Sequence, residues 1–350
     1  MKRFTIGLMI LSLLSVWFFT GCSKDDDNPV SYVDNYEKAV VYKETLGTTH
    51  TGDYFPLVPY RKINFSGHMK ADVQIQIPGI GTEEETVDED IYGAQLVLEQ
   101  TQVALPGGSL SLYPIVDTMD MTTDTTRFFM KGDTAVYIKA IKVADGEYLE
   151  VEDPVFVKNN LVVGDSWKSA PRVDVTKMMQ AEMSEDESTV SNLTMNAEAK
   201  FYVAGEESID LPVGTRMAVR LEQANDIVIS GQMIEEGESA NLNVDAKLAI
   251  VYHVIADTGV VHQDVTGQMN IAISYSGQTI TVLMDIQQSE LKLTYISTVY
   301  DLSPFPYDRN PLSKQAFSGR QTPEFQSVQE KKAWSLSHKI ARCMIRQLTL

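Results

Sequence analysis

The chain has 350 residues, of which 43% are hydrophobic, and carries a formal net charge of −19 at pH 7. A surface this negative repels nucleic acid and anionic membrane faces, so nucleic acid is not expected as a partner. The two cysteines, Cys22 and Cys343, are too few for a disulfide framework or a thiolate metal site. The chain is long enough to bury a full core in one large or two modest domains.

Residues 1–21 have the pattern of a secretory signal peptide. Lys2 and Arg3 are basic, and residues 4–19 form an uncharged, mainly apolar stretch. This stretch is too short for a membrane-spanning helix, which needs about 20 apolar residues. Removal of residues 1–21 takes away the two positive charges and changes the net charge of the mature chain from −19 to −21.

The residues around Cys22 indicate how the mature chain is held. Phe19, Thr20 and Gly21, followed by Cys22, resemble the lipobox of bacterial lipoproteins, although Phe19 stands where that family usually has leucine. The resemblance implies cleavage before Cys22 and a lipid anchor of several acyl chains, palmitate among them. One acyl chain binds a membrane only marginally, whereas several make the attachment stable. The alternative is an ordinary signal peptide with an incidental cysteine.

A short charged run follows the cysteine directly and consists of Ser23, Lys24, Asp25, Asp26 and Asp27. It resembles the export signal of surface lipoproteins of the Bacteroidetes. The resemblance implies an outer-membrane lipoprotein exposed at the cell surface, with a periplasm-facing location as the alternative. The run is otherwise a solvated acidic tether. It lacks the turn glycine and closing glutamate of an ordered calcium loop.

The rest of the chain divides into four regions. Residues 22–35 are expected to form the lipidated acidic tether, and the folded part begins near Tyr36. We expect a β-rich region over 36–160 and an antiparallel β region over 161–303. Residues 304–350 contain four prolines and carry a charge of +5, which predicts a basic extension that is peripheral or disordered.

Alternation of apolar and polar residues predicts the strands. Residues 71–77 alternate with the period of a half-buried strand, and residues 136–143 and 149–151 form a hairpin around Asp145-Gly146. In the second half, the pattern predicts strands around residues 193–203, 217–221, 242–250, 269–275 and 280–286. Turn residues separate them at 212–214, 257–259 and 276–277.

Sequential strands of this kind pair antiparallel, with one apolar and one wet face. The residues expected to share one interior are Phe201, Val219, Leu248, Ile271 and Val282. Those expected to face water are Lys200, Arg220, Lys247, Asn270 and Thr281. The predicted fold is mainly β, with a minor α+β character: long antiparallel strands in a curved sheet or partial barrel, with one or two short helices.

One helix is expected over residues 175–183, with Asp174 as its cap. Met178, Met179 and Met183 give it an apolar side. Ordinary core packing is the favoured interpretation, and an adaptable lid over an apolar ligand is the alternative.

Two short motifs carry a second resemblance. Tyr54–Leu57 and Val163–Trp167 resemble motifs of uncharacterised, secreted, β-rich lipoproteins, in which such a motif opens a β domain. The resemblance implies the start of two halves near residues 50 and 160. No activity follows from it.

The chain carries no recognisable catalytic motif, so we expect no enzyme activity, no cofactor and no metal site. The five histidines have no ligand spacing, and neither a nucleophile elbow nor a phosphate-binding glycine loop occurs. His253 and His262 flank the predicted turn at 257–259 and could face each other across a hairpin. Solvent-side strand positions are the favoured interpretation.

Three threonines follow aspartates in a pattern that Bacteroidetes use for O-glycosylation, namely Thr118, Thr125 and Thr134. We interpret them as candidate glycosylation sites in a threonine-rich loop. A metal site of Asp117, Asp120 and Asp124 is the weaker alternative.

Two functions are in contention. The favoured one is a cell-envelope lipoprotein that binds a glycan or protein at the cell surface without chemistry. The alternative is a half-barrel carrier or sensor of an apolar or lipid ligand. Aromatic residues on a wet face would favour glycan binding, and a deep cavity lined by Met and Ile would favour the carrier.

Overall fold

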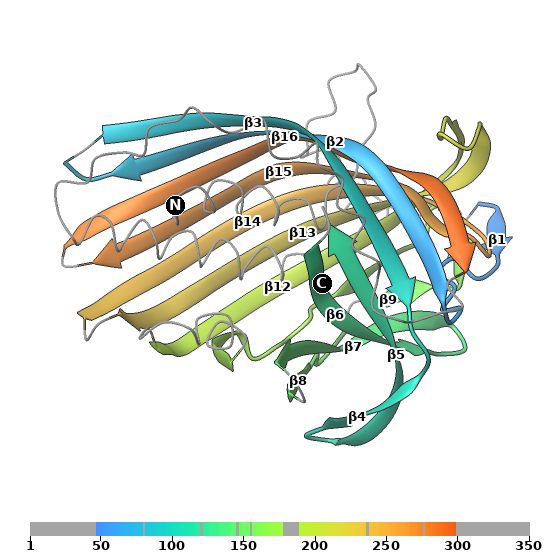
Figure 1. The fold of residues 1–350 in the computed structure, drawn as a ribbon, viewed down its shortest axis with the longest axis horizontal. Helices are drawn as coiled ribbons and strands as arrows, with labels where there is room; N and C mark the ends of the chain where they lie inside the picture. Colours follow the sequence, from blue (N-terminus) through green and yellow to red (C-terminus); the bar gives the residue numbers. More distant parts are fainter. Residues whose placement is uncertain are drawn as a thin grey trace.

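The computed structural model describes residues 47–298, apart from residues 80, 120–121, 145–146, 155, 178–188, 236–237 and 276. Seven long strands dominate these residues (Figure 1). They are β2 (Arg61–Ile77), β3 (Gly81–Val97), β12 (Thr189–Ile209), β13 (Arg216–Glu235), β14 (Glu238–Ile255), β15 (Gly259–Tyr275) and β16 (Gln278–Thr298).

The long strands lie side by side in one curved sheet. Strands β12 to β16 pair in chain order, and β16 then pairs with β2, which pairs with β3. Short strands continue the sheet at both edges: β4 (Thr101–Leu105), β5 (Gly108–Met119), β6 (Thr122–Lys131), β7 (Ala135–Ala144), β8 (Glu147–Glu150), β9 (Phe156–Lys158) and β11 (Ser166–Ser169). In the described residues this sheet has fourteen strands, and β1 (Thr49–Thr51) and β10 (Asn160–Val162) form a separate pair.

All pairings in the large sheet are antiparallel, and the sheet is not closed. The predicted mainly β fold with long antiparallel strands in a curved sheet is therefore confirmed. The predicted hairpin around residues 145–146 is formed by β7 and β8. The turn at 257–259 joins β14 to β15.

The buried apolar residues of the long strands lie on the concave face of the sheet. Successive strand residues point to opposite sides, so every second residue belongs to this face. The five residues predicted to share an interior are all buried in one cluster: Phe201, Val219, Leu248, Ile271 and Val282. Their neighbours in sequence point to the other side, where Lys247 and Asn270 are exposed. Met217 belongs to the same alternating pattern but lies near the start of β13 and is 57% exposed.

Glycines allow close backbone contact between β2 and β16 and between β14 and β15. A Cβ atom on Gly67 of β2 would lie 1.4 Å from the backbone oxygen of Glu290 in β16. Gly267 of β15 has a φ of +143°, and a Cβ atom there would lie 2.2 Å from the backbone oxygen of Lys247. Both positions exclude a side chain, so the glycines permit backbones to approach more closely than an ordinary strand pair would.

Strands β4 to β9 lie below one end of the long strands, on their concave side (Figure 1). A row of aromatic rings joins this group to β11 and β12 at the other end of the strand order. Phe156 of β9 stacks on Trp167 of β11 at 6.1 Å between centroids, and Trp167 stacks on Phe201 of β12 at 5.0 Å. The Trp167 indole also donates a hydrogen bond of 3.2 Å to the Phe156 backbone oxygen. No β-pairing between β9 and β11 occurs in the described residues, so side chains hold this seam together.

Two local expectations have different outcomes. The predicted helix begins at Val175, and Asp174 caps it, because its Oδ1 accepts a 3.0 Å hydrogen bond from the Lys177 backbone nitrogen. Residues 178–183 lie outside the described residues. The prediction that the threonine-rich segment forms a loop is wrong, because residues 122–131 form strand β6. Threonine is β-branched and suits a strand.

Several predicted features lie outside the described residues, among them the signal peptide, Cys22, the run from Ser23 to Asp27, and residues 304–350. The division of the folded part at residue 160 stays a prediction. In the described residues, no helix has the length and apolar character that crossing a membrane requires.

Candidate functional site

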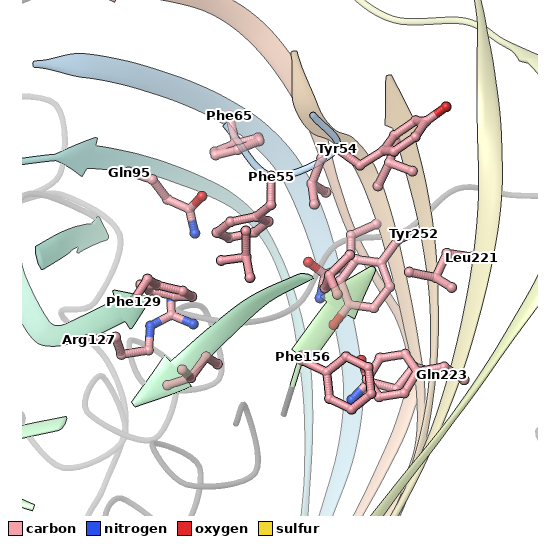
Figure 2. Close-up of a pocket in the computed structure, with 17 residues that line it drawn as sticks. Tyr54, Phe55, Phe65, Gln95, Arg127, Phe129, Phe156, Leu221, Gln223 and Tyr252 are labelled. Atoms are coloured by element: carbon pink, nitrogen blue, oxygen red, sulfur yellow. The ribbon is translucent and has the colours of Figure 1, made fainter. Parts of the chain in front are cut away.

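A cavity of about 100 Å³ lies between the concave face of the long strands and the short strands below it (Figure 2). Strands β2, β3 and β12 to β15 supply one wall, and β6, β7, β9 and the segment before β2 supply the other. An apolar cavity of about 150 Å³ is large enough to bind benzene. This cavity is smaller than that and has room for the end of an alkyl chain.

Most of the cavity wall is aromatic or aliphatic. The aromatic lining residues other than Tyr252 are Tyr54, Phe55, Phe65, Phe129, Phe156 and Phe201. Phe55 stacks on Phe129 with 5.3 Å between ring centroids, which ties the segment before β2 to β6. Stacked rings are rigid and bury large areas, so the wall is preformed. The motif Tyr54–Leu57 thus contributes to this site through its first two residues.

Five polar side chains from five strands also line the cavity: Gln95 (β3), Arg127 (β6), Gln223 (β13), Tyr252 (β14) and Gln263 (β15). Figure 2 shows the polar ends of Gln95, Arg127 and Tyr252 directed toward the space between them. A largely apolar cavity with a few convergent polar groups is the usual form of a small-molecule site.

Arg127 is held by a buried ion pair. Its NH2 group lies 2.6 Å from Asp117 Oδ2 on β5, and its Nε donates to the same oxygen at 3.2 Å. Its guanidinium carbon lies 5.6 Å from the centre of the Phe129 ring. The partner carboxylate neutralises the charge of Arg127, so the cavity wall has no unbalanced formal charge.

Tyr252 and Gln223 have their own constraints. Burial raises the pKa of the Tyr252 phenol well above its ordinary value, and the nearby Arg127 opposes this only in part. The phenol therefore stays protonated and is a hydrogen-bond donor. Gln223 Nε2 donates a 2.7 Å hydrogen bond to Asn225 Oδ1, two residues further along the concave side of β13.

The turn between β14 and β15 is fixed against the segment before β2. Arg61 donates to the backbone oxygens of Asp257 at 3.1 Å and Thr258 at 2.6 Å. The Asp257 backbone nitrogen donates to the Asp53 backbone oxygen at 2.8 Å. These bonds hold the hairpin, and with it Val254 and Val260 of the lining, next to Tyr54.

The opposite side of the same hairpin carries a chain of titratable groups. His253 Nδ1 and His262 Nδ1 are 2.7 Å apart, so one nitrogen donates a proton to the other. His253 Nε2 also contacts Glu207 of β12, and His262 Nε2 lies 3.3 Å from Glu290 of β16. Lys292 Nζ lies 2.5 Å from the same Glu290 oxygen. The chain thus connects β12, β14, β15 and β16.

The histidines do face each other, as the sequence allowed, but the favoured solvent-side interpretation is wrong because both are buried. The pKa of His253 is lowered to about 4, mainly by burial; the bond to Glu207 opposes this shift, and the charge of His262 adds to it. Burial raises the pKa of Glu290, but bonds and charges from His262 and Lys292 outweigh it and hold that pKa below its usual range. In the described residues, no group of three or more metal-ligating side chains occurs.

The structure separates the three candidate glycosylation sites. Thr118 lies in β5 and Thr125 in β6, whereas Thr134 is exposed just before β7. The alternative metal site is contradicted at Asp117, because this carboxylate is buried against Arg127. Asp120 lies outside the described residues. Glycosylation itself stays a prediction.

Sequence reasoning missed the polar lining of the cavity. Its signal is present in β13, where Val219, Leu221, Ile227 and Ile229 are buried on the concave side. Gln223 and Asn225 occupy the same register between them and are also buried. Polar residues inside an apolar alternation are expected where a site needs hydrogen bonds.

No protein-family model matches the chain, and no curated protein sequence gives a significant match. Solved structures give weak likenesses. A protein of Bacteroides fragilis described as exported, with a YmcC-like fold, has a TM-score of 0.30 and 10% identity over 69% of this chain and 99% of its own. A protein of Parabacteroides distasonis described as a lipoprotein has a TM-score of 0.29 and 11% identity over 69% of this chain and 100% of its own.

A variant of OmpT, an outer membrane protein of Vibrio cholerae, has a TM-score of 0.20 and 9% identity over 67% of this chain and 99% of its own. Likenesses of this size define neither the fold nor the function of this chain.

Proposed function

We propose that the protein is a lipid-anchored, non-catalytic binding protein of the cell envelope that holds an apolar or amphipathic molecule in the cavity beneath the concave face. The observation that carries this proposal is the aromatic cavity with five polar side chains in its lining. Among the described residues, the cavity lining contains no serine, cysteine, histidine or carboxylate, which supports binding rather than nucleophilic or acid–base chemistry. The half-barrel carrier was the alternative to the glycan- or protein-binding function in the sequence analysis. It is now the first candidate.

The cavity also differs from the one that sequence reasoning associated with a carrier. Its wall is aromatic and amide-bearing rather than rich in methionine and isoleucine. Aromatic walls favour rings and alkyl chain ends of defined shape, and amides fix the orientation of a polar group. We therefore propose a ligand with a small apolar end and a polar part.

Filling the cavity tests this function. Val136 of β7 is buried in the lining, so Val136→Phe should occupy the space that a ligand needs. We expect octan-1-ol to bind the mature wild-type chain and to bind this variant at least about tenfold more weakly, as measured by isothermal titration calorimetry. Because the side chain enters an existing space, the cost in stability should stay below about 3 kcal/mol.

Val228→Phe is the matched control, because Val228 is exposed on the convex side of β13. This control should bind octan-1-ol like the wild type, and circular dichroism should show that both variants are folded. Equal affinities in all three proteins would contradict the proposed site.

The anchor is tested separately. Cys22→Ala should block acylation and leave a soluble or unprocessed protein, because the thiol is the acceptor of the acyl chains. Metabolic labelling with a fatty-acid analogue measures this, with Cys343→Ala as the control that keeps its label. Continued labelling of the Cys22 variant would remove the lipoprotein assignment.

Binding of a glycan or protein at the cell surface is the second candidate function, and two exposed tyrosines favour it. Tyr92 of β3 and Tyr295 of β16 are 58% and 56% exposed. Their strands flank β2, where Tyr92 lies opposite Ser66 and Tyr295 opposite Asn64. Exposed aromatic rings beside polar groups suit stacking on sugar rings. Surface exposure and the export signal remain part of the proposal.

A further inference from the structure

Two polar side chains on the concave face are buried, and each has an atom without a hydrogen-bond partner in the described residues. Asn225 of β13 and Ser169 of β11 are each 6% exposed. Neither Asn225 Nδ2 nor Ser169 Oγ has a hydrogen-bond partner. Buried polar atoms are nearly always hydrogen-bonded in folded proteins, because an unpaired one loses its bonds to water without replacement. The two atoms therefore call for a partner that the described residues do not supply.

The strand register places these two residues on either side of one alanine. Ser169 lies opposite Ala199 of β12, and Ala199 lies opposite Asn225. Neighbouring strands are about 4.8 Å apart, so the two outer residues are separated by about 10 Å, too far to bond directly. Ala199 between them has a small side chain. Two polar atoms without a partner in the described residues thus flank this alanine.

The position of these three residues adjoins the cavity. Trp167 and Phe201 occupy the next inward-facing position along β11 and β12, and Phe201 lines the cavity. The amide of Asn225 is oriented by the cavity residue Gln223, which donates to its Oδ1 at 2.7 Å. That bond leaves Asn225 Nδ2 as the free donor. If the apolar end of a ligand fills the cavity, the ligand atoms that follow this end come near Asn225 Nδ2.

Resting on the proposed function, we propose that Asn225 and Ser169 form a subsite over Ala199 for an uncharged oxygen-bearing group of the ligand, a hydroxyl or a carbonyl. Asn225 donates to that oxygen, and the Ser169 hydroxyl donates or accepts as the group requires. A charged head group is disfavoured, because Arg127 is the one charged residue of the lining and Asp117 already neutralises it. The ligand class is therefore a neutral amphiphile such as a fatty alcohol or ester.

Ser169→Ala is the decisive variant. It removes only an oxygen that has no partner in the free protein, so the folded state should be at least as stable as the wild type. We expect it to bind octan-1-ol about fivefold more weakly and to bind octane unchanged. Calorimetry measures the alcohol, and headspace partition measures the alkane. The wild type should prefer octan-1-ol to octanoate and octylammonium by about tenfold or more.

Ser289→Ala is the matched control, because Ser289 also carries a buried, unpartnered hydroxyl but lies on β16 beside Met69. It should bind octan-1-ol like the wild type. Asn225→Leu provides a second test and should also reduce the preference for the alcohol over the alkane. A loss of affinity in Ser289→Ala equal to that in Ser169→Ala would overturn the subsite.

The outcomes separate the subsite from the proposed function. Unchanged alcohol preference in Ser169→Ala and Asn225→Leu, with binding still blocked by Val136→Phe, would overturn the subsite and leave the cavity as the binding site. No binding of octan-1-ol or octane to the wild type would overturn both.

Discussion

Replacement of Arg127 by methionine should lower the free energy of unfolding by about 3–5 kcal/mol, because the variant leaves the Asp117 carboxylate buried without its cation. The two side chains are only 6% and 7% exposed, and two hydrogen bonds to one carboxylate oxygen join them. Methionine keeps much of the length of arginine, so the loss reports the charge rather than the volume. Urea unfolding followed by circular dichroism measures it.

Two further variants separate burial from charge. Arg172→Met removes a guanidinium paired with Asp153 at the surface, where both side chains are more than 60% exposed, and should cost less than about 1 kcal/mol. Adding Asp117→Leu to Arg127→Met should restore most of the lost stability, because no buried charge remains. Similar losses in Arg127→Met and Arg172→Met would show that the ion pair is not buried in solution.

Acidification should destabilise the protein through the histidine pair. The pKa of His253 is about 4 in the folded protein and 6.5 when unperturbed. The unfolded chain therefore binds a proton between these values that the folded chain does not, so stability falls as the pH drops from about 6.5 to about 4. The shift corresponds to a loss on the order of 3 kcal/mol. Urea unfolding at a series of pH values measures this slope.

His253→Gln isolates the contribution of the pair. This variant should be less stable than the wild type at pH 7.5, because glutamine does not reproduce both ring contacts, but its stability should fall less between pH 6.5 and 4. The lowered pKa of Glu290 adds a loss at acidic pH in both proteins, so the difference between their slopes is the informative quantity. His68→Gln removes a half-exposed histidine and should keep the wild-type slope. An identical slope in His253→Gln would contradict the assignment.

Much of the fold was predictable from the sequence because a strand with one buried face has a period of two. The alternation around Phe201, Leu248 and Ile271 correctly gave the strands, their antiparallel pairing and their common apolar face. The pairing of β16 with β2 was not predictable. Local patterns specify which side of a strand is buried, but they do not specify which distant strand lies next to it.

The candidate site was harder to predict for two physical reasons. Arg127 and Asp117 lie in segments whose threonines suggested a loop, so their burial was not expected. The amides of Gln223 and Asn225 have no motif, and only their place inside an apolar register marks them. His253 and His262 were recognised as hairpin neighbours, yet alternation alone does not show that the convex side is also buried at that end.

The partnership of β2 with β16 has a consequence for how the chain acquires its structure. The first and last long strands are neighbours, and Asn64 and Tyr295, 231 positions apart in sequence, are joined by a hydrogen bond. Contacts between such distant segments require a large loop to close, which makes folding slow relative to proteins with local contacts. When the chain is made from its N-terminus onward, the β12–β15 meander can form as soon as these strands are present. One edge of β2 stays unpaired until β16 is present. During that interval β2 is the strand most open to pairing with another molecule.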